Sequence, residues 1–192
     1  MNQMMIFLSA FAITFMADIQ PVMEQPDFSG EWNMAAAAGR GQQGQRGQRG
    51  QRSSRARSSL GSGWGAQFSI AQTENGLTVE RPFFTRGDMQ PPLKYRYALD
   101  GTETRNTILM GRGYQEQVSK TAWDGDKLTI TTLHKSQNPV DGKKVNCEVT
   151  QTLSLLVDES TPDAPPSLVV ETTRSGALGG PPSTSRTVYG KN

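Results

Sequence analysis

The chain of 192 residues offers few side chains that bind metals or attack substrates. His134 is its single histidine and Cys147 its single cysteine. A zinc site draws several ligands from histidine, cysteine and carboxylate side chains. One histidine and one cysteine, without a spaced set of partners, predict no metal site. Cys147 lies in an alternating run, so we expect a half-buried strand residue, with an intermolecular disulfide or a reactive thiol as the alternative.

The motifs of hydrolases and phosphate-binding enzymes are missing from the sequence. A Ser-His-Asp triad would use His134, but no Gly-x-Ser-x-Gly turn is present to carry its serine. Asp124 and Asp126 flank Gly125, yet no glutamate closes an EF-hand loop, so this segment predicts a turn. The glycine-containing segment 111–114 precedes no helix that would complete a phosphate cradle. We therefore predict a non-enzymatic protein without cofactors.

The segment 39–59 combines arginine, glycine and glutamine in tandem copies of Gln-Arg-Gly. This composition buries too little apolar surface to offset ordering, so we expect a disordered loop over residues 35–63. The loop is interpreted either as a solvated spacer or as an arm for anionic surfaces and polymers. Nucleic acid is not expected as a partner, because no aromatic residue is interleaved for base stacking. The candidate anion-binding residues are Arg40, Arg46, Arg49, Arg52, Arg55 and Arg57.

Most of the remaining chain alternates apolar and polar residues with a period of two, which is typical of strands with one buried face. Asn75-Gly76, Asp100-Gly101 and Asp124-Gly125 predict tight hairpins, because these residues tolerate positive φ. Beyond the N-terminal segment, no window shows sustained helical spacing. The expected strands are 28–34, 64–72, 77–82, 93–99, 103–109, 116–123, 127–134, 144–157 and 168–174, with 185–189 as a tenth candidate.

The predicted fold is all-β: an antiparallel up-and-down meander that closes into a barrel or a strongly bent sheet. Tyr95 and Tyr97 are the best candidates for lining a ligand cavity, with Phe68 and Leu128 beside them, and core packing is the alternative. The alternation places the following residues on the inner face: Trp64, Ala66, Phe68, Ile70, Leu77, Val79, Leu93, Tyr95, Tyr97, Leu99, Leu128, Ile130, Cys147, Val149, Leu153 and Leu155.

The N-terminal segment is apolar from residue 4 to residue 17 and ends at Asp18. It is shorter than the ~20 residues that span a bilayer as a helix. We therefore predict an export signal over 1–17, with a buried N-terminal helix as the alternative. An extended leader over 18–27 and a single domain over 28–192 complete the predicted organisation. The mature protein is expected to be periplasmic or extracellular, with no transmembrane segment.

The first strand opens with Gly30-Glu31-Trp32, which resembles the Gly-x-Trp opening of the lipocalins and related calycin barrels. In that family the tryptophan plugs one barrel end and a basic residue near the last strand packs across its ring. The resemblance assigns these roles to Trp32 and Arg186. Residues 28–32, 123–128 and 187–189 are also similar to a group of uncharacterised secreted bacterial β-meander proteins.

Two functions follow from these expectations. The apolar inner face that includes Tyr95 and Tyr97 predicts an exported, non-enzymatic, lipocalin-like barrel that holds a small apolar ligand between its strands. The alternative is an envelope-associated interaction protein, in which the arginine-rich loop binds anionic surfaces and the barrel is inert.

Overall fold

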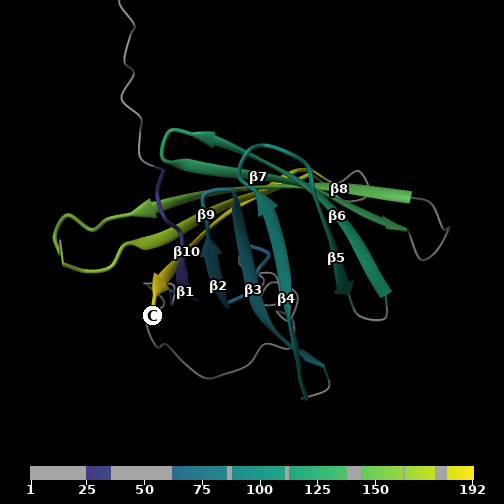
Figure 1. Cartoon of the computed structure of the whole chain (residues 1–192), viewed down its shortest axis with the longest axis horizontal. Coiled ribbons are helices and arrows are strands. Elements are labelled where there is room, and N and C mark those ends of the chain that lie inside the picture. The colour runs from purple at the N-terminus through teal and green to yellow at the C-terminus, as the bar shows by residue number, and fades with distance from the viewer. Residues whose placement is uncertain are drawn as a thin grey trace, which may run out of the picture.

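The computed structural model describes residues 25–35, 62–85, 88–110, 113–137, 144–161, 163–175 and 181–192. Within these ranges the chain forms ten strands of one sheet (Figure 1). The strands are β1 Gly30–Met34, β2 Gln67–Gln72, β3 Gly76–Thr85, β4 Asp88–Ala98, β5 Thr104–Met110, β6 Gly113–Asp124, β7 Lys127–Gln137, β8 Lys144–Leu156, β9 Ser167–Arg174 and β10 Ser183–Lys191.

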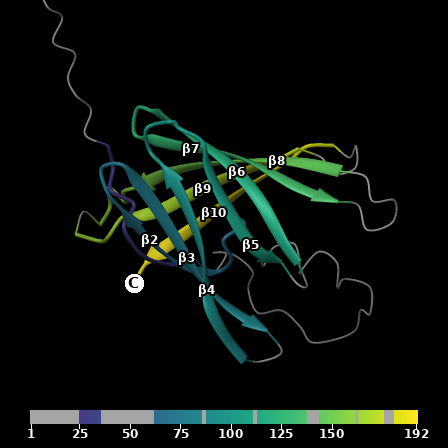
Figure 2. The ribbon, with the colours of Figure 1, turned by 45° about the vertical axis from the view of Figure 1, so that its right-hand side comes forward.

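The sheet is an antiparallel meander whose strand order is β4-β3-β2-β1-β10-β9-β8-β7-β6-β5. β1 joins the two ends of the domain, because Trp32 is paired with Phe68 of β2 on one side and with Lys191 of β10 on the other. Figures 1 and 2 show the sheet curling on itself into a nearly closed barrel. The predicted all-β meander is confirmed, and the alternation of buried and exposed side chains is its cause.

One seam of the barrel, between β4 and β5, lacks a backbone ladder in the described residues. We expected a paired hairpin at Asp100-Gly101, and this was wrong: the chain turns there, with Gly101 at φ 80°, but β4 and β5 separate (Figure 1). Side chains of β5 form hydrogen bonds with backbone groups of β4 instead. Asn106 accepts from the Arg96 amide and donates to the Arg96 carbonyl, both at 2.8 Å, and Thr104 Oγ1 accepts from the Ala98 amide at 2.9 Å.

Replacing Asn106 with leucine should loosen this seam. The change leaves the amide and carbonyl of Arg96 without their partner, which costs about 1–3 kcal/mol of unfolding free energy. Urea titration measures the loss, and hydrogen exchange at the Arg96 amide should become faster. The exposed neighbour Thr107 is the control, because Thr107→Ala removes no such bond. Equal exchange rates in wild type and Asn106→Leu would show that the side chain does not seal the seam.

The interior confirms the period-two pattern on most strands. The fully buried residues with the largest side chains include Trp32, Phe68, Leu128, Ile130 and Leu153, each no more than 2 % exposed. Ala66 is an exception to the predicted inner face, because it is exposed and precedes β2. The buried side chains form one connected hydrophobic cluster inside the barrel.

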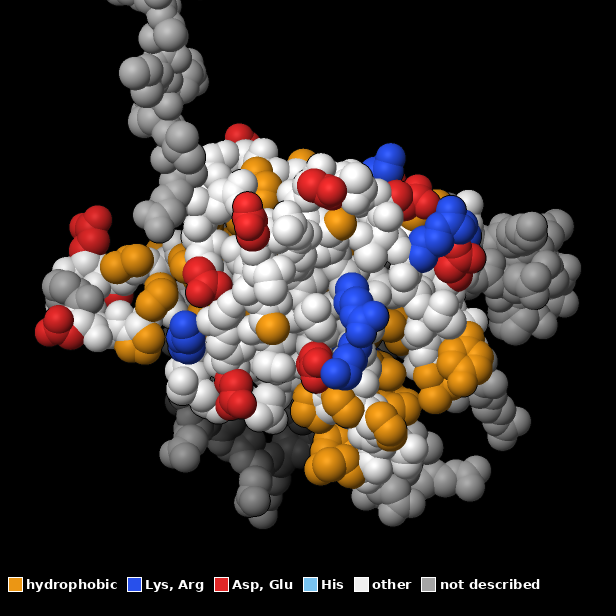
Figure 3. Space-filling model, in the orientation of Figure 1, with side chains coloured by type: hydrophobic (Ala, Val, Ile, Leu, Met, Phe, Trp, Pro, Cys, Tyr) orange, Lys and Arg blue, Asp and Glu red, His pale blue; other side chains and the backbone are white. Residues whose placement is uncertain are grey.

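Large exposed hydrophobic side chains lie near the free ends of two hairpins. Phe84 and Met89 belong to the β3–β4 hairpin and Tyr114 to the β5–β6 hairpin, and all three are more than half exposed. Figure 3 shows hydrophobic side chains gathered over these hairpin ends. Phe84 and Tyr114 are therefore suitable surface controls for substitutions in the interior.

Two predicted segments lie outside the described residues. The export signal over 1–17 and nearly all of the arginine-rich loop, with its six candidate arginines, fall in the ranges 1–24 and 36–61. Both stay predictions. Among the described residues, no helix has the length and apolar character needed to cross a membrane.

Candidate functional site

The inner faces of the strands change character along their length. On β7, Leu128 and Ile130 are fully buried in the apolar cluster, whereas Thr132 and His134 continue the same face with polar groups. Strands β3 and β9 change in the same way, with Arg81 and Arg174 following apolar residues of equal parity, and Gln151 lies on the inner face of β8 between Val149 and Leu153. The barrel therefore has an apolar half and a polar half.

A turn over residues 62–65 enters the barrel where these halves meet. Ser62 and Trp64 are buried, and the glycines that follow each of them have positive φ: +102° at Gly63 and +96° at Gly65. Other residue types are strained in this conformation, so the alternation of glycine with buried residues lets the chain turn inside the barrel.

Hydrogen bonds from three strands hold this turn. The Ser62 carbonyl accepts from Gln151 Nε2 at 2.7 Å and from Thr172 Oγ1 at 3.4 Å. The Ser62 amide donates to the Tyr189 hydroxyl oxygen at 3.0 Å. The same hydroxyl lies 2.9 Å from Ser62 Oγ and 3.1 Å from the Gly65 carbonyl, either of which can accept its proton. Buried backbone groups of the turn are thereby satisfied by side chains of β8, β9 and β10.

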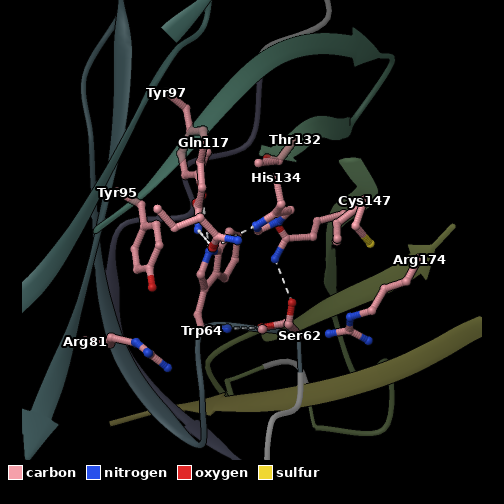
Figure 4. Close-up of a pocket in the computed structure, with 14 residues that line it drawn as sticks. Ser62, Trp64, Arg81, Tyr95, Tyr97, Gln117, Thr132, His134, Cys147 and Arg174 are labelled. Atoms are coloured by element: carbon pink, nitrogen blue, oxygen red, sulfur yellow. Dashed lines mark hydrogen bonds between the residues drawn. The ribbon is translucent and has the colours of Figure 1, made fainter. Parts of the chain in front are cut away.

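A cavity of about 340 Å³ lies against this turn (Figure 4). Trp64, Tyr95 and Tyr97 form an aromatic wall, in which Trp64 Nε1 donates to the Tyr97 hydroxyl at 3.3 Å. The volume falls within the roughly 300–1,000 Å³ of small-molecule sites. The other lining residues are Ser62, Gly63, Arg81, Gln115, Gln117, Thr132, His134, Cys147, Val149, Gln151 and Arg174.

Two arginines reach this cavity from opposite sides of the turn (Figure 4). A Cβ atom on Gly63 would lie 3.6 Å from Arg174 Nη2, and one on Gly65 would lie 3.9 Å from Arg81 Nη1. Both guanidinium groups therefore lie close to the backbone of the turn. No aspartate or glutamate lines the cavity in the described part of the chain.

Burial shifts the pKa of three side chains that line the cavity. Burial raises the pKa of the Tyr95 and Tyr97 hydroxyls, so both remain protonated donors at neutral pH. Burial, and then the charge of Arg174, lower the pKa of His134. The His134 Nδ1 atom lies 3.4 Å from Gln115 Oε1. The described lining therefore carries two positive charges at neutral pH.

Replacing Arg174 with glutamine should raise the pKa of His134, because it removes the second cause of the depression. Because folding lowers this pKa, the unfolded chain binds the proton more tightly. His134 therefore contributes stability above its unfolded pKa of about 6.5, and this contribution is lost as the pH falls from there to the folded value. A proton NMR titration of the single imidazole measures the pKa. Arg186→Gln, on the exposed surface, is the control, and an unchanged pKa in Arg174→Gln would mean that burial alone is responsible.

The structure places the four predicted ligand-lining residues in two different regions of the barrel. Tyr95 and Tyr97 line the cavity, each about one-twentieth exposed. Leu128 is fully buried in the apolar cluster and is not part of the cavity wall. Phe68 also belongs to the cluster, where its ring packs edge-on against Tyr189 with centroids 4.8 Å apart. Phe68 and Leu128 therefore belong to the apolar half.

Lys191, and not Arg186, lies over the Trp32 ring. Lys191 Nζ is 5.7 Å from the ring centroid, whereas Arg186 is exposed and its Nε lies 4.0 Å from Glu171. The expected partner was wrong because β10 continues to Lys191, which pairs directly with Trp32 across the sheet. Gly30, at φ +146°, permits this approach, since a Cβ there would lie 2.6 Å from Lys191 Cε.

Arg81 and Arg174 are the residues that our sequence analysis missed. A signal was present: Arg81 has the parity of Leu77 and Val79, and Arg174 has the parity of Leu168 and Val170. Extending the period of two to the end of each strand places both arginines on the inner face. Because charged side chains are mostly exposed, the charge of both arginines favoured the outer surface. Only the cavity makes an inward position tolerable for them.

Cys147 and His134 lie side by side on β8 and β7, with directly paired Cα positions. The Cys147 Sγ atom is 3.5 Å from the Ser175 carbonyl oxygen, which is its closest polar contact within the described residues. The described part of the chain includes no cluster of three or more histidine, cysteine or carboxylate side chains that could hold a metal ion.

No known family model matches the sequence, and no curated protein or solved structure shows significant similarity to it. The all-antiparallel, nearly closed barrel is compatible with a lipocalin-like barrel.

Proposed function

We propose that this protein is a non-enzymatic, lipocalin-like binding protein that holds a small ligand in the cavity beside the turn 62–65. The single observation that supports this function is the cavity itself, about 340 Å³ in volume and open to solvent. A barrel without a ligand role would fill this space with side chains, as the apolar half of this barrel does. An aromatic wall of Trp64, Tyr95 and Tyr97 would contact the apolar part of the ligand.

The arrangement of the lining favours binding over catalysis. A nucleophile needs a base within hydrogen-bond reach and a third group that orients the base. Here the only nitrogen contact of His134 in the described residues is the amide oxygen of Gln115, and the Cys147 thiol contacts backbone carbonyls and Ser175. Amides, hydroxyls and arginines are instead suited to fixing the orientation of a bound molecule.

Native mass spectrometry of the full chain, purified from its own host, tests this proposal. We expect a retained small molecule that is lost on denaturation. Val149→Phe, which adds volume to the cavity wall, should reduce its occupancy, whereas Val157→Phe on the exposed surface should not. Absence of a retained mass, with no thermal stabilisation by a panel of small molecules, would contradict the proposal.

The alternative proposal is that the arginine-rich loop docks on anionic surfaces and that the barrel is inert. It is supported by six arginines and no acidic residue between positions 39 and 59. Deleting 39–59 should abolish retention on anionic vesicles at low salt, since this binding is electrostatic. Equal retention of the intact and deleted chains would eliminate this proposal.

We further propose that the protein is exported, on the basis of the short apolar segment ending at Asp18. The mass of the mature chain tests it. Processing near residue 17 is expected, and an intact N-terminus on the mature protein would contradict export by a cleaved signal.

A further inference from the structure

We infer that the ligand of this cavity is a small amphipathic carboxylate, whose anionic group is held by Arg81 and the hydroxyl of Tyr95. This inference rests on the cavity-binding function proposed above and adds the chemical class of the ligand. It replaces the purely apolar ligand that the sequence analysis led us to expect.

The charge of the cavity is the first support. Arg81 and Arg174 line it, and no acidic side chain does so in the described residues. Partly buried cations are costly unless an anion or a set of acceptors neutralises them. Neither arginine forms a salt bridge with a described residue, although exposed pairs such as Lys94–Glu80 do form elsewhere on the barrel. A bound anion would provide the missing charge.

The position of Arg81 is the second support. Its Nε atom is buried and has no hydrogen-bond partner among the described residues. Its guanidinium lies near Tyr95: burial raises the pKa of the Tyr95 hydroxyl, and the charge of Arg81 opposes this rise. Figure 4 shows the Tyr95 hydroxyl on the side of the cavity where Arg81 enters. A planar carboxylate accepts two parallel bonds from a guanidinium group and a third from a neighbouring hydroxyl, and this geometry favours it over a single-point acceptor.

The remaining lining limits the body of the ligand. The rings of Trp64 and Tyr97, which are tilted by 51° to each other, provide apolar surface, and Val149 also lines the cavity. A volume of about 340 Å³ lies at the small end of the range for small-molecule sites, which favours one aromatic ring or a branched chain beside the carboxylate. The ligand class is therefore a small aromatic or branched monocarboxylate.

Arg81 is favoured over Arg174 as the anchor. Arg174 lies beside His134, whose lowered pKa it helps to cause, and it reaches the cavity near Cys147 (Figure 4). The Ser62 and Thr132 hydroxyls also line the cavity, but they already form hydrogen bonds with Tyr189 and Ser119, both at 2.9 Å. Arg174 contributes charge to the cavity, whereas Arg81 and Tyr95 together provide directed donors.

Phenylacetate and its uncharged isostere phenylacetamide test the inference on the full chain. Titration followed by calorimetry or NMR should show phenylacetate binding about tenfold more tightly than phenylacetamide, because a charge-assisted pair forms only with the carboxylate. Arg81→Gln should remove this preference while the amide binds as before. Arg81→Lys, which retains the charge without the planar fork, should keep only part of it. Arg186→Gln is the control and should bind as wild type does.

The outcomes separate this inference from the proposed function. Equal binding of both compounds to the wild-type chain overturns the carboxylate assignment and leaves cavity binding intact. A preference that survives in Arg81→Gln and disappears in Arg174→Gln overturns the choice of Arg81. Binding of neither compound overturns the ligand class, and the proposed function is then judged by the native mass measurement alone. The wild-type comparison needs no variant, so a variant that fails to fold leaves the test valid.

Discussion

Replacing Trp32 with alanine is expected to lower the free energy of unfolding by about 3–5 kcal/mol. Trp32 is 1 % exposed, and its Nε1 atom donates to the Phe28 carbonyl at 2.9 Å. The substitution removes this bond and leaves a cavity at the place where β1 joins the first and last parts of the sheet. A loss of this size is a large fraction of the ~5–15 kcal/mol that stabilises an ordinary domain.

Urea unfolding followed by circular dichroism measures the effect. Trp32→Phe should cost less, because an aromatic ring remains and mainly the bond to Phe28 is lost. Phe84→Ala, at a side chain that is 59 % exposed, is the surface control and should change stability by less than about 0.5 kcal/mol. Similar losses at Trp32 and Phe84 would contradict the role of Trp32 as a packed end of the core.

Replacing Tyr189 with phenylalanine is expected to cost about 2–3 kcal/mol, although it removes a single oxygen atom. That oxygen accepts from the Ser62 amide and donates to Ser62 Oγ or to the Gly65 carbonyl. The ring itself is fully buried and stays in contact with Phe68. The loss therefore comes from buried polar groups of the turn that are left without a partner.

Because the turn is part of the cavity wall, Tyr189→Phe should also weaken ligand binding. Thermal unfolding and the phenylacetate titration measure the two effects on one sample. Tyr114→Phe is a matched control, since it deletes the same atom from a side chain that is 77 % exposed. If the Tyr189 and Tyr114 variants were equally stable, the hydrogen bonds to the turn would contribute nothing.

Much of the fold could be predicted because strand alternation is a local property. Two apolar residues spaced by two are enough to show which face of a strand is buried. Leu77 and Val79 on β3 and Leu128 and Ile130 on β7 are such pairs, and all four are no more than 1 % exposed. The seam was not predictable in this way. Asp100-Gly101 reads as a hairpin turn, and whether β4 and β5 then pair depends on Asn106 and its reach to the β4 backbone.

The sequence anticipated the inward position of Tyr95 and Tyr97, because they share the parity of the apolar face, and both line the cavity. Their contact with a ligand stays a prediction. Arg81 and Arg174 were missed because charged residues on strands usually face solvent. The turn 62–65 was missed as a structural element because nothing local shows that a Ser-Gly-Trp-Gly segment will enter a barrel; its partners are 89 to 127 residues away in the chain.

The amino-acid sequence by itself determined an antiparallel meander with one apolar face, because a period of two and turn residues act over a few neighbouring positions. The tertiary structure alone decided that Lys191 covers Trp32, that Asn106 takes the place of a backbone ladder, and that two arginines share a cavity that no acidic side chain lines in the described part of the chain. These features depend on which strand ends meet when the sheet curls. That meeting is set by the register and curvature of the whole barrel, which no short segment encodes.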